Sequence, residues 1–167
     1  IRRPPISKLF PYTTLFRSDP YSNSKSCSEL ITATYKRSFF DNINIAISTV
    51  RAGNVIGGGD FALDRIIPDC FRSVKGNDIL QIRYPDSIRP YQHVLEPLSV
   101  YLLLAMKQYE NIDYASSYNV GPSDDECLKT IQLVTEFKNS IERFSDLKLT
   151  FETQVKRDLH EASILKL

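Results

Sequence analysis

The segment Ile43–Ala52 constrains the fold more than any other part of this sequence. Its letters, INIAISTVRA, are rich in β-branched residues and place apolar side chains on both alternating faces. A strand that is apolar on both faces has to be covered on both, which is typical of parallel sheets. The preceding stretch, Tyr21–Phe40, has helical spacing and contains no proline or glycine. This order of helix and strand predicts a layered α/β domain.

The rest of the chain continues the alternation. Pro97 would lie in the first turn of one helix, where a missing N–H costs little, whereas Pro68 predicts a kink or restart in another. We expect helices over residues 63–75, 96–109 and 126–144, and strands over 79–83, 89–94, 117–120 and 147–153.

Length and charge exclude several classes of protein. The 167 residues suit one domain, and 21 basic against 20 acidic residues give a net charge of +1. Such a balance argues against nucleic acid as a partner. The longest apolar run, Val100–Met106, is too short to span a bilayer. Three scattered cysteines and two histidines predict neither disulfides nor a metal site, and reduced thiols fit a cytoplasmic protein.

The first eighteen residues differ in character from the remainder. They hold three arginines and three prolines without helical or strand periodicity. The stretch Leu9–Ser18 is similar to the translation of a common sequencing adapter, so we interpret residues 1–18 as a non-native or disordered extension. The alternative is a natural proline-rich arm. On the first interpretation, the recognisable protein begins at Asp19 and occupies residues 19–167.

The most informative motif for chemistry is Tyr21-Ser22-Asn23-Ser24-Lys25. Residues four apart share a helix face, so the Tyr21 hydroxyl and the Lys25 ammonium can converge. A free phenol ionises only near about pH 10, and an adjacent ammonium favours its phenolate form. Such a pair could remove a proton from a sugar hydroxyl. Taken alone the motif is weak, because both residue types are common on helices.

Longer phrases strengthen this interpretation. The Y-x-x-x-K helix, the buried strand and the following R-x-x-N-x-x-G at residues 51–57 resemble the extended short-chain dehydrogenase/reductase family. The phrases DPYSNSKSCSELI, VRAGNVIGGGDFALDRIIPDC, IRPYQHVLEPLSVYL, SYNVGPSDDECL and HEASILKL resemble the nucleotide-sugar enzymes within it, specifically CDP-glucose 4,6-dehydratases. The resemblance implies the C-terminal part of a Rossmann-like doubly wound parallel sheet, with a small mixed substrate-binding lobe.

The resemblance also implies roles for individual residues. Tyr21 would be the catalytic base, and Lys25 would hold the nicotinamide ribose of a bound NAD together with Tyr21 and Arg51. The implied substrate-binding residues, for a nucleotide sugar, are Asn54, Arg65, Arg89, Tyr91 and Glu161. An Arg side chain suits a diphosphate better than Lys does, because it can donate two parallel hydrogen bonds.

Simpler interpretations remain open for several of these residues. Arg51 could form a structural ion pair with a nearby carboxylate. Gly57–Gly59 follows a strand but lacks the spacing of a phosphate loop, which favours a turn. His93 alternates with apolar residues and is expected to be structural.

The implied reaction is an NAD-dependent dehydration of CDP-glucose to CDP-4-keto-6-deoxyglucose, a lyase activity of lipopolysaccharide O-antigen biosynthesis, carried out by a cytoplasmic homodimer. The alternatives are a UDP-sugar 4-epimerase or another nucleotide-sugar dehydratase of the same fold. A further alternative is an inactive fragment, because the sequence contains no G-x-G-x-x-G loop for the cofactor pyrophosphate.

Overall fold

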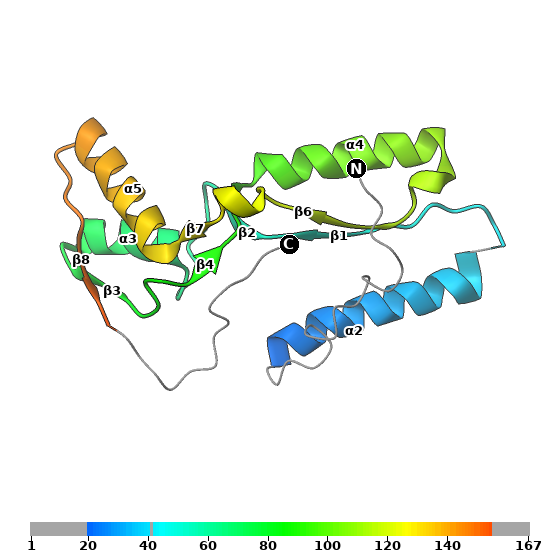
Figure 1. Ribbon diagram of the computed structural model, residues 1–167, viewed down its shortest axis with the longest axis horizontal. Helices are drawn as coiled ribbons and strands as arrows, with labels where there is room; N and C mark the ends of the chain where they lie inside the picture. Colours follow the sequence, from blue (N-terminus) through cyan, green and yellow to red (C-terminus); the bar gives the residue numbers. More distant parts are fainter. Residues whose placement is uncertain (1–19, 41, 155–167) are drawn as a thin grey trace. The chain divides into compact units, whose positions relative to one another are not determined.

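The computed structural model of the protein describes residues 20–40 and 42–154 (Figure 1). These residues divide into two compact units. The first contains the described residues up to Arg51 together with Pro97–Val120, and the second contains Ala52–Glu96 and the described residues from Gly121 onward. The predicted extension over residues 1–18 lies outside the described ranges.

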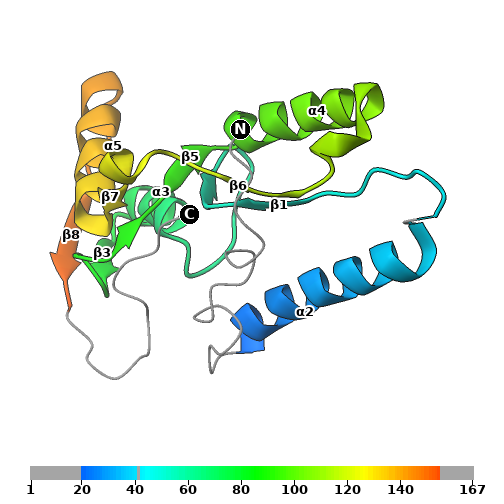
Figure 2. The same cartoon turned by 45° about the vertical axis from the view of Figure 1, so that its right-hand side comes forward.

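The first unit is built from two helices and one strand pair. Helix α2, Pro20–Tyr35, continues as a π-helical turn over Lys36–Phe40, so the predicted helix is confirmed. Strand β1, Thr49–Ala52, pairs with β6, Ser117–Val120. Helix α4, Leu95–Glu110, runs alongside this strand pair, as both views of the ribbon show (Figures 1 and 2).

The strand predicted over residues 43–52 is shorter in the structure than in the prediction. Its ladder begins at Thr49, and all four residues of β1 are half-buried, not buried. After Gly53 the chain forms a further strand, β2, Asn54–Ile56, which the sequence pattern did not indicate. Among the described residues β1 pairs with β6 alone, so its second edge has no ladder partner there.

The second unit combines parallel and antiparallel strand pairs. β2 pairs in parallel with β5, β3 in parallel with β8, and β4 antiparallel with β7. The predicted strand over 89–94 is divided at Pro90 into β4 and β5, because proline cannot donate to a ladder. The remaining elements are α3, Ile66–Gly76; β3, Ile79–Ile82; β4, Ile88–Arg89; β5, Tyr91–His93; β7, Leu128–Lys129; α5, Thr130–Phe144; and β8, Thr150–Thr153.

A hydrophobic core lies between α3, α5 and the β3–β8 pair. Its buried members are Cys70, Val74, Leu80, Ile82, Val134 and Leu149. The rings of Phe71 and Phe137 join α3 to α5 in an edge-to-face contact, with centroids 4.8 Å apart. The Cys70 side chain is fully buried, and this loss of solvation raises the pKa of its thiol to about 12. This unit therefore holds a core of its own.

Two predicted helices begin later than the sequence suggested. Helix α3 starts at Ile66 instead of residue 63, and Pro68 lies in its first turn, where its missing N–H breaks no helical hydrogen bond. Helix α5 starts at Thr130 instead of residue 126. The residues before it form a 3-10 turn over Asp124–Glu126 and strand β7. The Glu126 carboxylate caps that turn by accepting from the Ser123 hydroxyl at 2.7 Å, which holds the pKa of Glu126 below its ordinary value.

Over residues 20–40 and 42–154 no helix has the length and apolar character needed to cross a bilayer. The same part of the chain contains no cluster of three or more His, Cys, Asp or Glu side chains able to bind a metal ion.

Candidate functional site

The Tyr21 and Lys25 side chains lie together on the first turns of α2. The Lys25 ammonium is 5.2 Å from the centroid of the Tyr21 ring. This contact follows from their spacing of four residues, which places both on one helix face. Tyr21 is 71% exposed, so its hydroxyl is open to a ligand. The Ser24 hydroxyl donates to the Tyr21 carbonyl at 2.7 Å and helps to fix this first turn.

Arg51, on β1, lies in the same unit but is bound within the protein. Its guanidinium donates through Nε and Nη2 to the two carboxylate oxygens of Glu29 on α2. Its Nη1 donates to the Asn119 side chain on β6 at 3.0 Å. These bonds are those of the structural ion pair that the sequence left open. The contact of Arg51 with a cofactor, which the resemblance implies, stays a prediction.

Three of the predicted substrate-binding residues lie on neighbouring strands of the second unit. Asn54 on β2 is the ladder partner of Tyr91 on β5, and the Asn54 N–H donates to the Pro90 carbonyl at 3.0 Å. Arg89 ends β4, two residues before Tyr91, and is 8% exposed. Its guanidinium donates to the Ile88 carbonyl at 3.0 Å. The structure thus brings Asn54 and Tyr91 together as ladder partners, with Arg89 two residues before Tyr91, and their binding roles stay predictions.

The sequence pattern did not indicate two residues with hydroxyl side chains near Tyr91, which are Thr130 and Ser87. Thr130, the first residue of α5, has its hydroxyl 3.4 Å from the Tyr91 hydroxyl and 3.1 Å from the Ser87 hydroxyl. Thr130 and Ser87 are each 8% exposed. The only signal in the sequence was a Thr at a helix start, and the predicted helix began four residues too early to reveal it.

Arg65 is the residue immediately before α3. Its backbone is extended, and its carbonyl accepts the Asp69 N–H at 2.9 Å, so it forms the N-terminal boundary of the helix. Its side chain is exposed and lies 3.8 Å from the Asp60 carboxylate. Glu161 lies outside the described residues.

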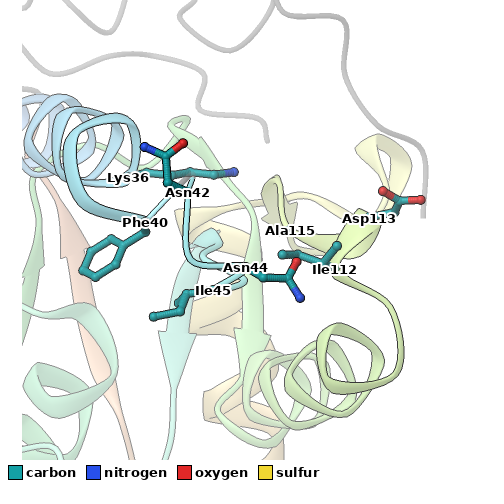
Figure 3. Close-up of a pocket in the computed structure, with 8 residues that line it drawn as sticks. All are labelled: Lys36, Phe40, Asn42, Asn44, Ile45, Ile112, Asp113 and Ala115. Carbon is teal, nitrogen blue, oxygen red and sulfur yellow. The ribbon is translucent and has the colours of Figure 1, made fainter.

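His93 and a surface pocket are two further features of the described residues. His93 Nδ1 accepts the Leu95 N–H at 3.3 Å, a structural role at the start of α4. A pocket of about 430 Å³ opens in the first unit between the end of the π-helical turn and the segment after α4 (Figure 3). Its lining includes Lys36, Asn44 and Asp113 but none of the predicted site residues.

Comparison with known proteins places these residues in context. No family model matches the chain. The CDP-glucose 4,6-dehydratase of Salmonella typhimurium is 48% identical over 124 residues, covering 71% of this chain and 34% of that protein. The chain thus spans about a third of the length of this curated relative.

Solved structures agree on the fold. The UDP-glucuronic acid 4-epimerase of Bacillus cereus, solved with UDP-glucuronic acid and NAD, has a TM-score of 0.67 at 17% identity, over 89% of this chain and 43% of that one. The UDP-glucose 4-epimerase of Stenotrophomonas maltophila, solved with NAD, has a TM-score of 0.65 at 18% identity, over 87% and 45%. The described strands and helices are therefore part of a Rossmann-like α/β fold.

Proposed function

The chain belongs to the NAD-dependent epimerase/dehydratase family, and from that premise we propose that it carries the Tyr–Lys helix and the substrate lobe of a CDP-glucose 4,6-dehydratase. The observation that carries the proposal is the Tyr21–Lys25 pair, stacked at 5.2 Å on an exposed face of α2. The domain assignment follows from it: residues 19–167 form part of an NAD-binding domain together with a substrate-binding lobe. The same proposal includes a cytoplasmic homodimer.

The Tyr–Lys pair fits one end of an NAD molecule. An exposed phenol and an ammonium on one helix face can both bind the nicotinamide ribose, and NAD there would take a hydride from the sugar and later return it. The six glycines of the sequence form no G-x-G-x-x-G loop, so the described residues offer no cradle for the pyrophosphate end. Among the residues present, Tyr21 and Lys25 hold the cofactor, with Arg51 as a further candidate.

Tyr21 moves the proton in this proposal. Its Oη accepts the proton of the sugar 4-hydroxyl as the general base, and the Lys25 ammonium lies beside the same ring on α2. Protonated Tyr21 then releases the proton to solvent, because the product keeps its 4-keto group. A ligand can reach Tyr21 and Lys25 without any change in α2, because both side chains are exposed.

The second unit supplies the contacts to the nucleotide sugar. Arg89 and Tyr91 bind the diphosphate, because a guanidinium can donate paired hydrogen bonds to phosphate oxygens. Asn54, the ladder partner of Tyr91, binds beside them, and Arg65 binds the nucleotide end. The contact of Glu161 with ribose belongs to the same proposal.

A UDP-sugar 4-epimerase is the second candidate, because the same Tyr–Lys pair would serve that reaction. The two activities differ in product: a 4-keto-6-deoxy sugar absorbs light in alkali, whereas an epimer does not. The phrases around residues 57–70 and 89–97, together with the 48% identity, favour the dehydratase.

The test uses a hybrid dehydratase in which residues 19–154 of this chain replace the corresponding segment of the Salmonella enzyme. We expect NAD-dependent conversion of CDP-glucose to a product that absorbs in alkali, with UDP-glucose a poor substrate. Formation of an epimer from UDP-glucose would favour the second candidate. A folded hybrid that binds NAD but converts neither sugar nucleotide would contradict the proposal. The 167-residue chain itself, titrated with NAD in a calorimeter, should bind weakly or not at all, because it lacks the glycine loop.

A further inference from the structure

The loop from Gly57 to Arg65 is fastened to its surroundings by arginine side chains. It begins with three consecutive glycines, which lose more conformational entropy on ordering than other residues. Its end is Arg65, the residue proposed to contact the nucleotide. A loop of this composition needs bonds from a rigid element if Arg65 is to be held in one place.

Arg72 on α3 supplies those bonds. Its guanidinium donates to the Phe61 carbonyl at 3.1 Å and to the Ala62 carbonyl at 2.9 Å. The same group forms an ion pair with Asp69, one turn earlier on the helix. Hydrogen bonds from a charged donor to backbone carbonyls are stronger than neutral ones, and two of them fix a direction as well as a distance.

The helix that presents Arg72 is rigid at this point. Cys70 and Val74, on either side of Arg72 in the sequence, are 0% and 8% exposed members of the core. The Arg72 backbone is thus fixed by packing, while its side chain reaches the loop. Asp69 and Arg72 are three residues apart on α3 and so lie on one face of the helix, and Arg65 directly precedes the helix.

Other contacts complete the arrangement at the loop itself. Asp60 accepts the Ala62 N–H at 3.0 Å and also faces Arg65 at 3.8 Å. Asp64, whose φ of 60° lies in the left-handed region, pairs with Arg83 at 2.9 Å. The Arg83–Asp64 pair is exposed and weak by itself. Arg72, by contrast, lies outside the loop and binds two of its backbone carbonyls.

We propose that Arg72 is a positioning residue for the substrate: it holds the Gly57–Arg65 loop so that Arg65 meets the nucleotide end of a sugar nucleotide. This inference rests on the proposed function, because it assigns to Arg72 the placement of a residue that the proposal puts in contact with the nucleotide. On this inference Arg72, which forms an ion pair with Asp69 on α3, also contributes to substrate affinity.

The first measurement is hydrogen exchange on the complete 167-residue chain. Arg72→Gln should raise the exchange rate of the Ala62 amide by about tenfold or more, because the loop loses its backbone anchor. Arg72→Lys keeps the charge and the Asp69 pair but cannot reach both carbonyls, so its effect should be intermediate. Arg143→Gln, at the end of α5, is the matched control and should leave this amide unchanged.

The second measurement is steady-state kinetics in the hybrid dehydratase. Arg72→Gln should raise KM for CDP-glucose by about tenfold and change kcat by less than about twofold, the pattern expected when ground-state and transition-state binding weaken equally. In an Arg65→Ala background the same substitution should have almost no further effect on KM, because the side chain that Arg72 positions is gone.

The outcomes separate the two proposals. A normal Arg65→Ala effect combined with a fully additive Arg72→Gln effect overturns the positioning role and leaves the proposed function standing. An Arg65→Ala variant with unchanged KM contradicts the nucleotide contact itself, and the role of Arg72 falls with it. An unchanged exchange rate at Ala62 in Arg72→Gln shows that the loop does not need this anchor and also overturns the inference.

Discussion

The Arg51 guanidinium binds both carboxylate oxygens of Glu29 and so joins strand β1 to helix α2. Because Glu29 stands one turn after Lys25 on that helix, the ion pair also fixes the part of α2 that carries the proposed catalytic pair. A third bond, from Arg51 to Asn119 at 3.0 Å, extends the connection to β6. Arg51 therefore supports the site structurally whether or not it touches a ligand.

Replacing either partner of this ion pair should destabilise the chain. The Arg51 and Glu29 side chains are 31% and 19% exposed, so solvent screens the pair only in part. We expect Glu29→Gln and Arg51→Gln each to lower the free energy of unfolding by about 1 kcal/mol, with a coupling of similar size in the double variant. Urea unfolding measures both quantities. The exposed Lys107–Glu110 pair on α4 is the control and should show no measurable coupling. Additive effects of the two substitutions would contradict the ion pair.

Tyr21→Phe removes only the hydroxyl that is proposed to carry the proton. In the hybrid dehydratase we expect kcat to fall by about 10²- to 10⁴-fold, the usual contribution of a positioned acid or base. Folding should not change, because the side chain is 71% exposed. Tyr109→Phe, at a tyrosine that is 94% exposed on α4, is the matched control and should keep full activity. Equal turnover in both variants would remove Tyr21 from the mechanism.

Gly57 is expected to tolerate no side chain. A Cβ at this position would lie 2.8 Å from Val94 Cγ1 and 3.1 Å from Val94 Cβ, where β2 and β5 end side by side. Gly57→Ala should cost about 1–3 kcal/mol of unfolding free energy, as overpacking usually does. Adding Val94→Ala should restore part of that loss.

The neighbouring glycine provides the control for this effect. A Cβ at Gly58 would meet no atom within 4 Å, so Gly58→Ala should change stability by less than about 0.5 kcal/mol. If both alanine variants are equally destabilised, backbone freedom explains the glycines and the contact with Val94 does not.

The Cys70 thiol should make stability depend on pH in the alkaline range. Burial raises its pKa from 9.0 to about 12, so the folded chain holds this proton more tightly than the unfolded chain does. The stabilisation is complete below pH 9 and is lost as pH rises toward 12. The difference in urea midpoint between the wild type and Cys70→Ala should therefore narrow over that range.

The same burial predicts the reactivity of the thiols. At pH 8 a thiol reagent should modify the exposed Cys27 readily and Cys70 only after unfolding. Modification of Cys70 at the rate of Cys27 would contradict the core described here.

The elements that the sequence predicted well are those with a strong local signal. Helices α2 and α4 have long uninterrupted helical patterns, and both lie where the pattern indicated. Strands β2 and β7 have three and two residues, and their existence depends on β5 and β4, which lie far away in the sequence. A local sequence pattern cannot predict such a short strand, because the strand exists only through pairing with a distant partner.

The residues of the candidate site also divide into those with a local sequence signal and those whose contacts depend on tertiary packing. The spacing of Tyr21 and Lys25 is local, and the structure has them in contact. The bond of Arg51 to Glu29 was one of two sequence interpretations, because periodicity does not tell which carboxylate faces a strand end. Thr130 and the loop contacts of Arg72 join residues through tertiary packing, so the sequence pattern alone could not reveal them.

The parallel pairing of β3 with β8 also sets an order of events during synthesis. Gln81 and Glu152 face each other across these strands although they are 71 positions apart in the chain. Closing so long a loop is entropically slow, and native contacts at this separation form late. During translation β3 cannot pair with β8 until Thr153 has left the ribosome, and its edge stays unpaired and exposed until then. We therefore expect chaperone dependence during translation to centre on this edge strand.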